Sequence, residues 1–304
     1  MSFITAPGAL VGYTNLQNTA APNTVIPVSY FRASSGTAPN VDAAIVPKGS
    51  QGAILGAIPD NLTTGGDKRG QGAVDLQLYR LGIGASGVAS GSFAGLVAGQ
   101  DNIASGSDAF GGGGSLNTAT QQGSAFIGGQ NLTVDGVNSR AGGNQASVFG
   151  MLGVDVWSPN SGNTTGGRQL MDTVMTMNTG TAVPAILNTV GGSGAVQPGQ
   201  ADRNFVMKNN SLMSVDAFVV CNGNGTGEFA SFRVSGIVQR LGGAATSVVR
   251  QKTITPLANS AAFAACACDL IADTTAGGWD IQVTGIAATN MQWVASVRAH
   301  HAMY

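Results

Sequence analysis

A glycine-rich repeat between residues 82 and 150 constrains the fold more than any other feature of the chain. The tetrapeptide Ala-Ser-Gly-Ser begins at Ala89 and returns at Ala104, and the pair Ala109-Phe110 returns as Ala125-Phe126. These offsets of about 14 to 16 residues are shorter than the helical repeats. Gly, Ser and Asn clusters supply turns, and single apolar residues between them face inward. Because so small a coil cannot bury a core alone, the repeat predicts stacked coils of a short β-roll.

The composition also favours an assembled β protein. Charged residues make up 10% of the chain, whereas apolar residues make up 43% and 46 residues are glycine. Typical soluble domains hold about 25% charged residues. Disorder would need high charge and few apolar residues, so this composition argues against it. With a net charge of −1, a monomer would be poorly soluble, and we expect an oligomer or a particle component.

Several classes of partner are excluded by the same counts. The chain holds 14 Lys and Arg against 15 Asp and Glu, without a cationic cluster, so we expect no nucleic-acid binding. An apolar run long enough to span a membrane is missing, which argues against membrane insertion. The N-terminus lacks a basic segment followed by an apolar one, and no signal peptide is expected.

The chain divides by composition into four regions. Residues 1–66 form an irregular N-terminal attachment region with short strands expected at 24–31 and 52–58, and we expect it to become ordered by docking onto a partner. The β-roll follows at 67–157. Residues 158–203 are a linker with connector strands, one of them near 170–177.

The last region, residues 204–304, alternates clearly between apolar and polar residues. In one stretch Trp279, Ile281 and Val283 alternate with polar neighbours, and turn signals separate six such segments. This pattern predicts an antiparallel β-sandwich. Its expected strands are 214–221, 229–241, 248–257, 262–271, one around 279–284 and one around 291–298.

Cysteine and histidine give little material for a metal or cofactor site. Cys221, Cys266 and Cys268 are expected to be buried free thiols, since cysteine prefers the interior. The two histidines, His300 and His301, are adjacent and far along the chain from these cysteines. We therefore expect no metal site and no cofactor.

The search for catalytic motifs is also negative. Residues 82–87 match a GxGxxG pattern, but no helix follows, so a β-turn is favoured over a nucleotide site. Glycoside cleavage normally uses two carboxylates, and Glu228 is the sole glutamate. Asp101, Asp108 and Asp135 lie in the repeat, where Asp is an ordinary turn residue. No catalytic residue is assigned, and the chain is predicted not to be an enzyme.

Candidate receptor contacts come from loops, from an aromatic residue and from the chain end. The Gly-rich loop at 222–227 and the last residues could present polar groups at a tip. Trp279 alternates with polar residues along its strand, which favours core packing over receptor contact. The candidates are Asn222, Asn224, Thr226, Trp279, His300 and Tyr304.

The order of the segments resembles a known architecture. The Ala-Ser-Gly-Ser and Gly-Gly-x-Asn repeats resemble the left-handed β-roll collar of trimeric autotransporter adhesin heads. Lys68-Arg-Gly with Ala73-Val-Asp-Leu-Gln, then the roll, then a β-domain closing at Gly285–Val297 are similar to tail and head fibre proteins of phages and gene transfer agents. The resemblance covers residues 65–304.

This resemblance implies a homotrimer whose N-terminal region binds other virion proteins and whose C-terminal domain contacts host surface polysaccharide. The protein would be a virion component, assembled in the bacterial cytoplasm, that adheres by multivalent binding. Two alternatives stay open. One is an adaptor or cement protein without receptor contact. The other is a capsule depolymerase, which needs two Asp side chains to converge in a groove.

Overall fold

The computed structural model describes residues 16–18, 28–30, 53–54, 59–62, 66–77, 80, 84–159, 165–189 and 205–304. It divides into two compact units, Met1–Val46 and Pro47–Tyr304. In the first unit β1 (Leu16–Asn18) pairs antiparallel with β2 (Val28–Tyr30), which lies within the predicted strand 24–31. The rest of the predicted attachment region before β3 lies outside the described residues.

The described residues form strands and three short 3-10 helices, η1 (Gly84–Ser86), η2 (Ala244–Thr246) and η3 (Ala261–Phe263). The all-β prediction is therefore confirmed. No helix among these residues has the length and apolar character needed to cross a membrane.

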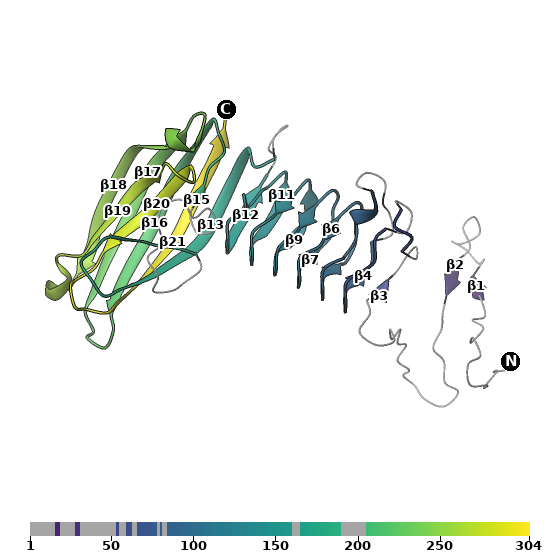
Figure 1. The fold of residues 1–304 in the computed structure, drawn as a ribbon, viewed down its shortest axis with the longest axis horizontal. Coiled ribbons are helices and arrows are strands. Elements are labelled where there is room, and N and C mark those ends of the chain that lie inside the picture. The colour runs from purple at the N-terminus through teal and green to yellow at the C-terminus, as the bar shows by residue number, and fades with distance from the viewer. Residues whose placement is uncertain are drawn as a thin grey trace. The chain divides into compact units, whose positions relative to one another are not determined.

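The first part of the second unit is a β-solenoid, seen as the ladder of short strands between β3 and β12 in Figure 1. Its parallel strands pair between residues 15 apart, as at Gly95, Phe110, Ala125 and Arg140, which confirms the predicted coil length. One stack contains β3 (Ala53–Ile54), β4 (Val74–Asp75), β5 (Gly95–Leu96), β7 (Phe110–Gly111), β9 (Ala125–Gln130), β11 (Arg140–Asn144) and β12 (Val154–Ser158). The other contains β6 (Ile103–Ala104), β8 (Thr118–Ala119) and β10 (Thr133–Val134).

Left-handed backbone conformations at the corners explain why the repeat is rich in Gly, Asn and Asp. A positive φ is unfavourable for most side chains and is tolerated best by these residues. Asp101 and Asp108, predicted as turn residues, have φ of 54° and 57°. The corner columns are Phe93, Asp108, Gly123, Asn138 and Gly153; Gly99, Gly114, Gly129 and Gly143; and Asp101, Leu116 and Asn131.

Buried amide side chains join successive coils. Asn117 is fully buried, and its Nδ2 donates to the carbonyl oxygens of Gly113 and Gly129 at 3.1 and 3.0 Å. Its Oδ1 accepts the backbone N–H of Leu132 at 3.0 Å. Asn102, one coil earlier, accepts the N–H of Asn117 in the same way at 3.1 Å. The amides thus satisfy backbone groups that the short strands leave unpaired.

Apolar side chains of neighbouring coils fit each other in size. Leu96, Gly111, Phe126 and Ala141 follow one another along the inside of the stack. A Cβ atom on Gly111 would collide with the Phe126 ring and the Leu96 side chain. The missing side chain at Gly111 therefore makes room for the fully buried Phe126 ring.

Beyond β12 the same sheet continues into long antiparallel strands. These are β13 (Arg168–Thr179), β21 (Met291–Met303), β16 (Ser211–Gly223), β17 (Phe229–Arg240) and β18 (Val248–Asn259), so that coils and long strands share one 12-stranded sheet. The strands predicted at 170–177, 214–221, 229–241, 248–257 and around 291–298 are confirmed. The structure does not show the separate sandwich domain predicted at 204–304, because its long strands extend the solenoid sheet.

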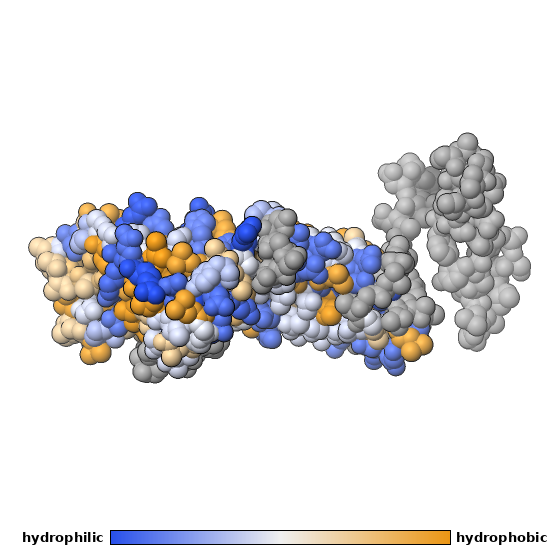
Figure 2. All heavy atoms as spheres, turned by 90° about the horizontal axis from the view of Figure 1, so that it is seen from above, coloured by the Kyte–Doolittle hydropathy of each residue, from blue (hydrophilic) through white to orange (hydrophobic). Residues whose placement is uncertain are grey.

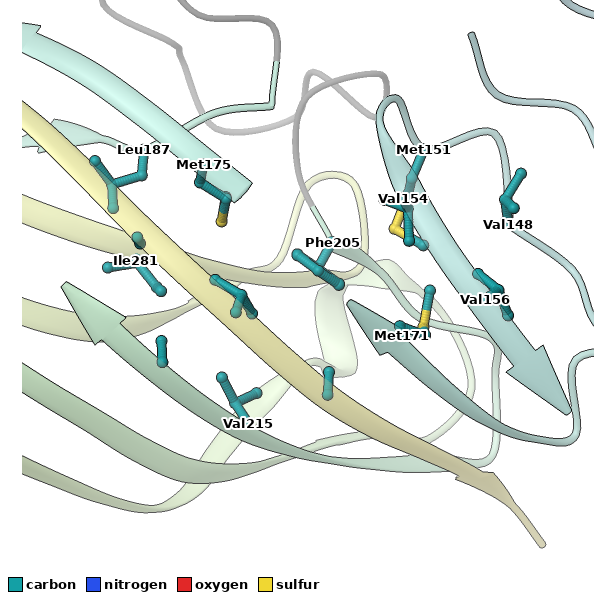
Figure 3. Packing of buried hydrophobic residues seen from close by; sticks show 14 of the residues in the cluster. Val148, Met151, Val154, Val156, Met171, Met175, Leu187, Phe205, Val215 and Ile281 are labelled. Carbon is teal, nitrogen blue, oxygen red and sulfur yellow. The ribbon is translucent and has the colours of Figure 1, made fainter. Parts of the chain in front are cut away.

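A second, four-stranded sheet covers the inner side of the long strands. It consists of β14 (Ala185–Ile186), β15 (Phe205–Val206), β19 (Ala267–Asp273) and β20 (Gly278–Thr284). Buried residues of both sheets and of the last coils form one core, part of which is drawn in Figure 3. Cys221, Cys266 and Cys268 are buried and free, as predicted, although Cys266 lies just before β19 rather than in it.

One carboxylate lies inside the second sheet without a partner. Asp280 of β20 is fully buried, and neither of its carboxylate oxygens has a hydrogen-bond partner among the described residues. Burial, and then the charge of Asp273, raise the pKa of Asp280 to about 7. The folded protein therefore holds this proton more tightly than the unfolded chain, whose Asp pKa is about 3.9.

We predict that the wild-type protein loses stability as the pH rises from about 4 to about 8, and that Asp280→Asn does not. Because the pKa of Asp280 is higher in the folded protein, the stability that its bound proton contributes is fully present below the unfolded pKa. This contribution is lost as the pH rises through the folded pKa of about 7. The loss should be on the order of 2 to 4 kcal/mol. Thermal unfolding across this pH range measures it. Asp108→Asn, at an exposed corner, is the control and should keep the wild-type slope.

A second prediction concerns the fit between coils. Gly111→Ala should cost about 1 to 3 kcal/mol of unfolding free energy, because the added methyl group displaces buried side chains. Gly95→Ala is the matched control, since its Cβ would approach Phe110 no closer than 3.6 Å. Denaturant unfolding of both variants checks the difference. Equal stabilities would contradict the packing described here.

Candidate functional site

The predicted receptor residues lie at two opposite ends of the long strands. Asn222 is exposed on β16, and Asn224 and Thr226 are exposed in the loop that follows it. His300 is exposed toward the other end of β21, and Tyr304 ends the chain with 70% of its surface exposed. A strand of 13 residues such as β21 is about 40 Å long. These residues therefore do not form one site.

Trp279 requires a correction, because it is a core residue. Its exposed fraction is 0%. Its ring stacks on Phe205 with 4.3 Å between centroids, and its Nε1 donates to Met213 Sδ at 2.9 Å. The core packing that the alternation favours for Trp279 is confirmed, and its place among the receptor candidates is wrong.

The side of the 12-stranded sheet that faces solvent, here called the outer face, carries many exposed apolar side chains. On the long strands, even-numbered residues of β13, β16 and β21 point outward and odd-numbered ones are buried. Figure 2 shows hydrophobic and hydrophilic residues side by side over the long-stranded part. The exposed apolar residues of this face include Val74, Phe110, Ile127, Trp157, Val174, Phe218, Val220 and Val294.

A row of charged residues crosses the outer face at right angles to the strands. Strand pairing places Arg140, Asp155, Asp172, Arg298 and Asp216 directly opposite one another on five neighbouring strands. Arg140 holds Asp155 with two contacts. Arg298 Nε and Nη2 donate to Asp172 at 2.9 and 3.2 Å. Arginine–carboxylate pairs of this forked kind have a defined geometry as well as a favourable charge.

The row is extended by Arg233 of β17, whose Nε and Nη2 donate to the two Asp216 oxygens at 3.0 Å each. Within this row, which we call the charged row, Asp155 and Asp172 are the one directly opposed pair of like charges. Side chains opposite each other on antiparallel strands have Cβ atoms about 4.5 to 5.5 Å apart. Two carboxylates are therefore neighbours on an exposed surface.

Apart from Arg140, which lines the smaller hollow, the charged row lines a groove of about 780 Å³, together with Val174, Phe218 and Leu257. A smaller hollow of about 190 Å³ adjoins it, between Ile127 and Trp157. The groove can accept a polar chain or the matching surface of another subunit. Within the described ranges, no group of three or more His, Cys, Asp or Glu side chains is placed to hold a metal.

This groove is not predicted from the sequence. Its residues come from segments far apart in the chain, and the pairing of β12 with β13 and of β13 with β21 brings them together. A signal was present, because each strand that contributes a charge is otherwise apolar or weakly polar near that position, as in Val-Asp-Val-Trp at 154–157. The partner strands could not be known from that signal.

Comparison with known proteins gives weak structural similarity. No protein-family model and no curated protein match the chain. A tailspike protein, gp49 of Acinetobacter baumannii bacteriophage Fri1, described as a capsular polysaccharide depolymerase, is similar over 76% of this chain and 48% of its own, with 6% identity and a TM-score of 0.24. The tailspike protein of Acinetobacter baumannii phage AM24 is similar over 76% and 50%, with 8% identity and a TM-score of 0.22. The chain thus spans about half the length of these neighbours.

The prediction that the chain is not an enzyme is contradicted by this comparison. The first of these neighbours is described as a depolymerase. The opposed pair Asp155 and Asp172 is formed by strand pairing, which the sequence alone does not show.

Proposed function

We propose that the chain is a subunit of a spike of a phage-type particle. It assembles as a homotrimer through the outer face and attaches the particle to polysaccharide on the host surface. The observation that carries this proposal is the outer face itself, where apolar side chains and the charged row lie on one continuous sheet.

A second copy of the chain is the partner that best fits the outer face. Soluble monomers rarely expose extended apolar patches, and such patches mark interaction surfaces. The charged row contains three Arg and three Asp residues, joined in three ion pairs. Because the row has no net charge, it favours neither an acidic nor a basic partner. Three copies around an axis would cover the part of the face around Val174 and Phe218 and leave the far ends of the long strands exposed; the fibre resemblance implies such a trimer.

The remaining parts of the proposal come from the resemblance to fibre proteins. The N-terminal region would connect the spike to other virion proteins, and the end with the long strands would meet the host. Three sites per trimer, and several trimers per particle, would raise avidity by about 100-fold or more over a single weak site.

We predict that the protein is a trimer in solution and that the double variant V174D/F218D is a monomer. Charged side chains at two exposed apolar positions should prevent burial of the face. Light scattering after size-exclusion chromatography measures the mass against 30.4 kDa per chain. Val183→Asp is the control, since Val183 is 66% exposed but lies outside the strands. A monomeric wild type, or a trimeric double variant, would contradict the proposed interface.

A second candidate function is cleavage of the bound polysaccharide. It is favoured by Asp155 and Asp172, which are opposed in the groove of the outer face. In retaining glycosidases, carboxyl groups about 5 to 5.5 Å apart act together. One carboxyl group protonates the leaving oxygen, and the other attacks the anomeric carbon. In the proposed trimer this groove would lie between neighbouring subunits.

For this candidate we predict that the protein releases new reducing ends from extracted host polysaccharide. Asp155→Asn and Asp172→Asn should each lower the rate at least about 100-fold, as expected for loss of a group acting in proton transfer or attack. Asp216→Asn is the matched control. It belongs to the same charged row and pairs with an arginine, but an arginine rather than a carboxylate lies opposite it on β21. If all three variants release reducing ends at the wild-type rate, Asp155 and Asp172 are not the catalytic pair.

A further inference from the structure

A row of carboxamide side chains crosses the outer face near one end of the long strands. Asn178 of β13 lies opposite Gln292 of β21, which lies opposite Asn222 of β16. Asn222 lies in turn opposite Phe229 of β17. All four side chains are exposed on the outer face. We call these four residues, three carboxamides and Phe229, the amide row.

Two loops add amides beside this row. Asn224 follows β16 and Asn290 precedes β21, and the backbone N–H of Asn224 donates to the Asn290 carbonyl oxygen at 2.9 Å. Asn178, Gln292, Asn224 and Asn290 line a hollow of about 340 Å³, together with Thr179, Gly180 and Met291. No charged residue is among those that line it.

The five amides of the row and the hollow, on Asn178, Asn222, Asn224, Asn290 and Gln292, are not used by the fold. None of the five carboxamide side chains makes a hydrogen bond to another described residue, in contrast to the solenoid amides, such as Asn117, which bond to the backbone. A carboxamide offers two donors and an acceptor oxygen. Five such groups in one place therefore present an uncommitted array of donors and acceptors.

Strand pairing fixes the backbone positions of the row relative to one another. Trp293 is buried directly below, and its Nε1 donates to Thr179 Oγ1 at 2.9 Å. Neighbouring strands lie about 4.8 Å apart, so the four positions of the row span about 14 Å. Sites built on strands hold their polar groups more precisely than sites built on loops.

From this arrangement we propose that the amide row and its hollow bind a neutral, hydroxyl-rich oligosaccharide segment, a proposal that rests on the polysaccharide attachment proposed above. Sugar hydroxyl groups donate and accept, as carboxamides do, and the exposed Phe229 ring offers an apolar surface to the carbon face of a sugar. An anionic glycan is not favoured, because neither Arg nor Lys lines the hollow. The row lies six residues along β13 from Asp172, about 20 Å away, so it is distinct from the charged row.

The test uses the 304-residue chain on an array of immobilised oligosaccharides. The array carries neutral hexose and N-acetylhexosamine oligomers beside their uronic-acid and sulfated counterparts. We expect binding to neutral oligomers that changes little between 0.15 and 0.5 M salt, because no charge is involved. N222A/Q292A should bind at least about 10-fold more weakly, and Phe229→Ala should also weaken binding. Gln251→Ala is the matched control, because it removes an exposed carboxamide of the same sheet from β18 and should bind as the wild type does.

Binding to anionic oligomers alone, or neutral binding that N222A/Q292A retains, would overturn the proposal. Adhesion to host cells, measured in parallel, distinguishes failure of the amide-row proposal from failure of the proposed attachment function. If wild type and N222A/Q292A adhere equally, the amide row is excluded and attachment stands. If the wild type neither adheres to cells nor binds any oligomer, both are overturned. The unfolding temperature of each variant is compared with that of the wild type. Equal temperatures show that a variant that binds weakly is still folded.

Discussion

The hydrogen bonds between successive coils are the interaction on which the rest of the structure depends. A coil of 15 residues has too little interior to be stable alone, and its short strands leave backbone groups unpaired at the corners. Asn102 and Asn117 satisfy those groups in the adjoining coils, so each coil is completed by its neighbours. The resulting register reaches β12 and passes through its antiparallel pairing to β13. Coils and long strands therefore present one continuous outer face.

Much of this fold could be predicted, because its two periods are visible in the chain. The return of Ala89 as Ala104 gives the coil length, and alternation located the long strands to within a few residues. Alternation states which residues share a side of a strand, but not what covers that side. Trp279 shows the limit, since β20 is covered on both sides and even Asp280 is buried. The continuity of the sheet could not be predicted either, because Ser158–Gly167 resembles a linker in composition.

The candidate sites were less predictable than the fold, because strand pairing creates them. Asn222 and Asn224 were found from their Gly-rich loop, whereas Asn178 and Gln292 became neighbours of Asn222 only through the pairing of β13, β21 and β16. The same holds for Asp155 and Asp172. A one-residue shift of any of these strands would turn its outward residues into the core. The interior thus fixes the arrangement of groups on the outer face.

The charged row and the amide row differ in what remains for a partner. In the charged row each carboxylate is already held by an arginine, so that much of its binding capacity is used within the chain, and exposed pairs of this kind contribute little stability. The amide row keeps its donors and acceptors free for hydroxyl groups. Neutral contacts of this kind are individually weak, and a spike that depends on them needs several copies acting together. The proposed trimer supplies those copies through the same sheet that carries the amide row, so the coil register supports both assembly and binding.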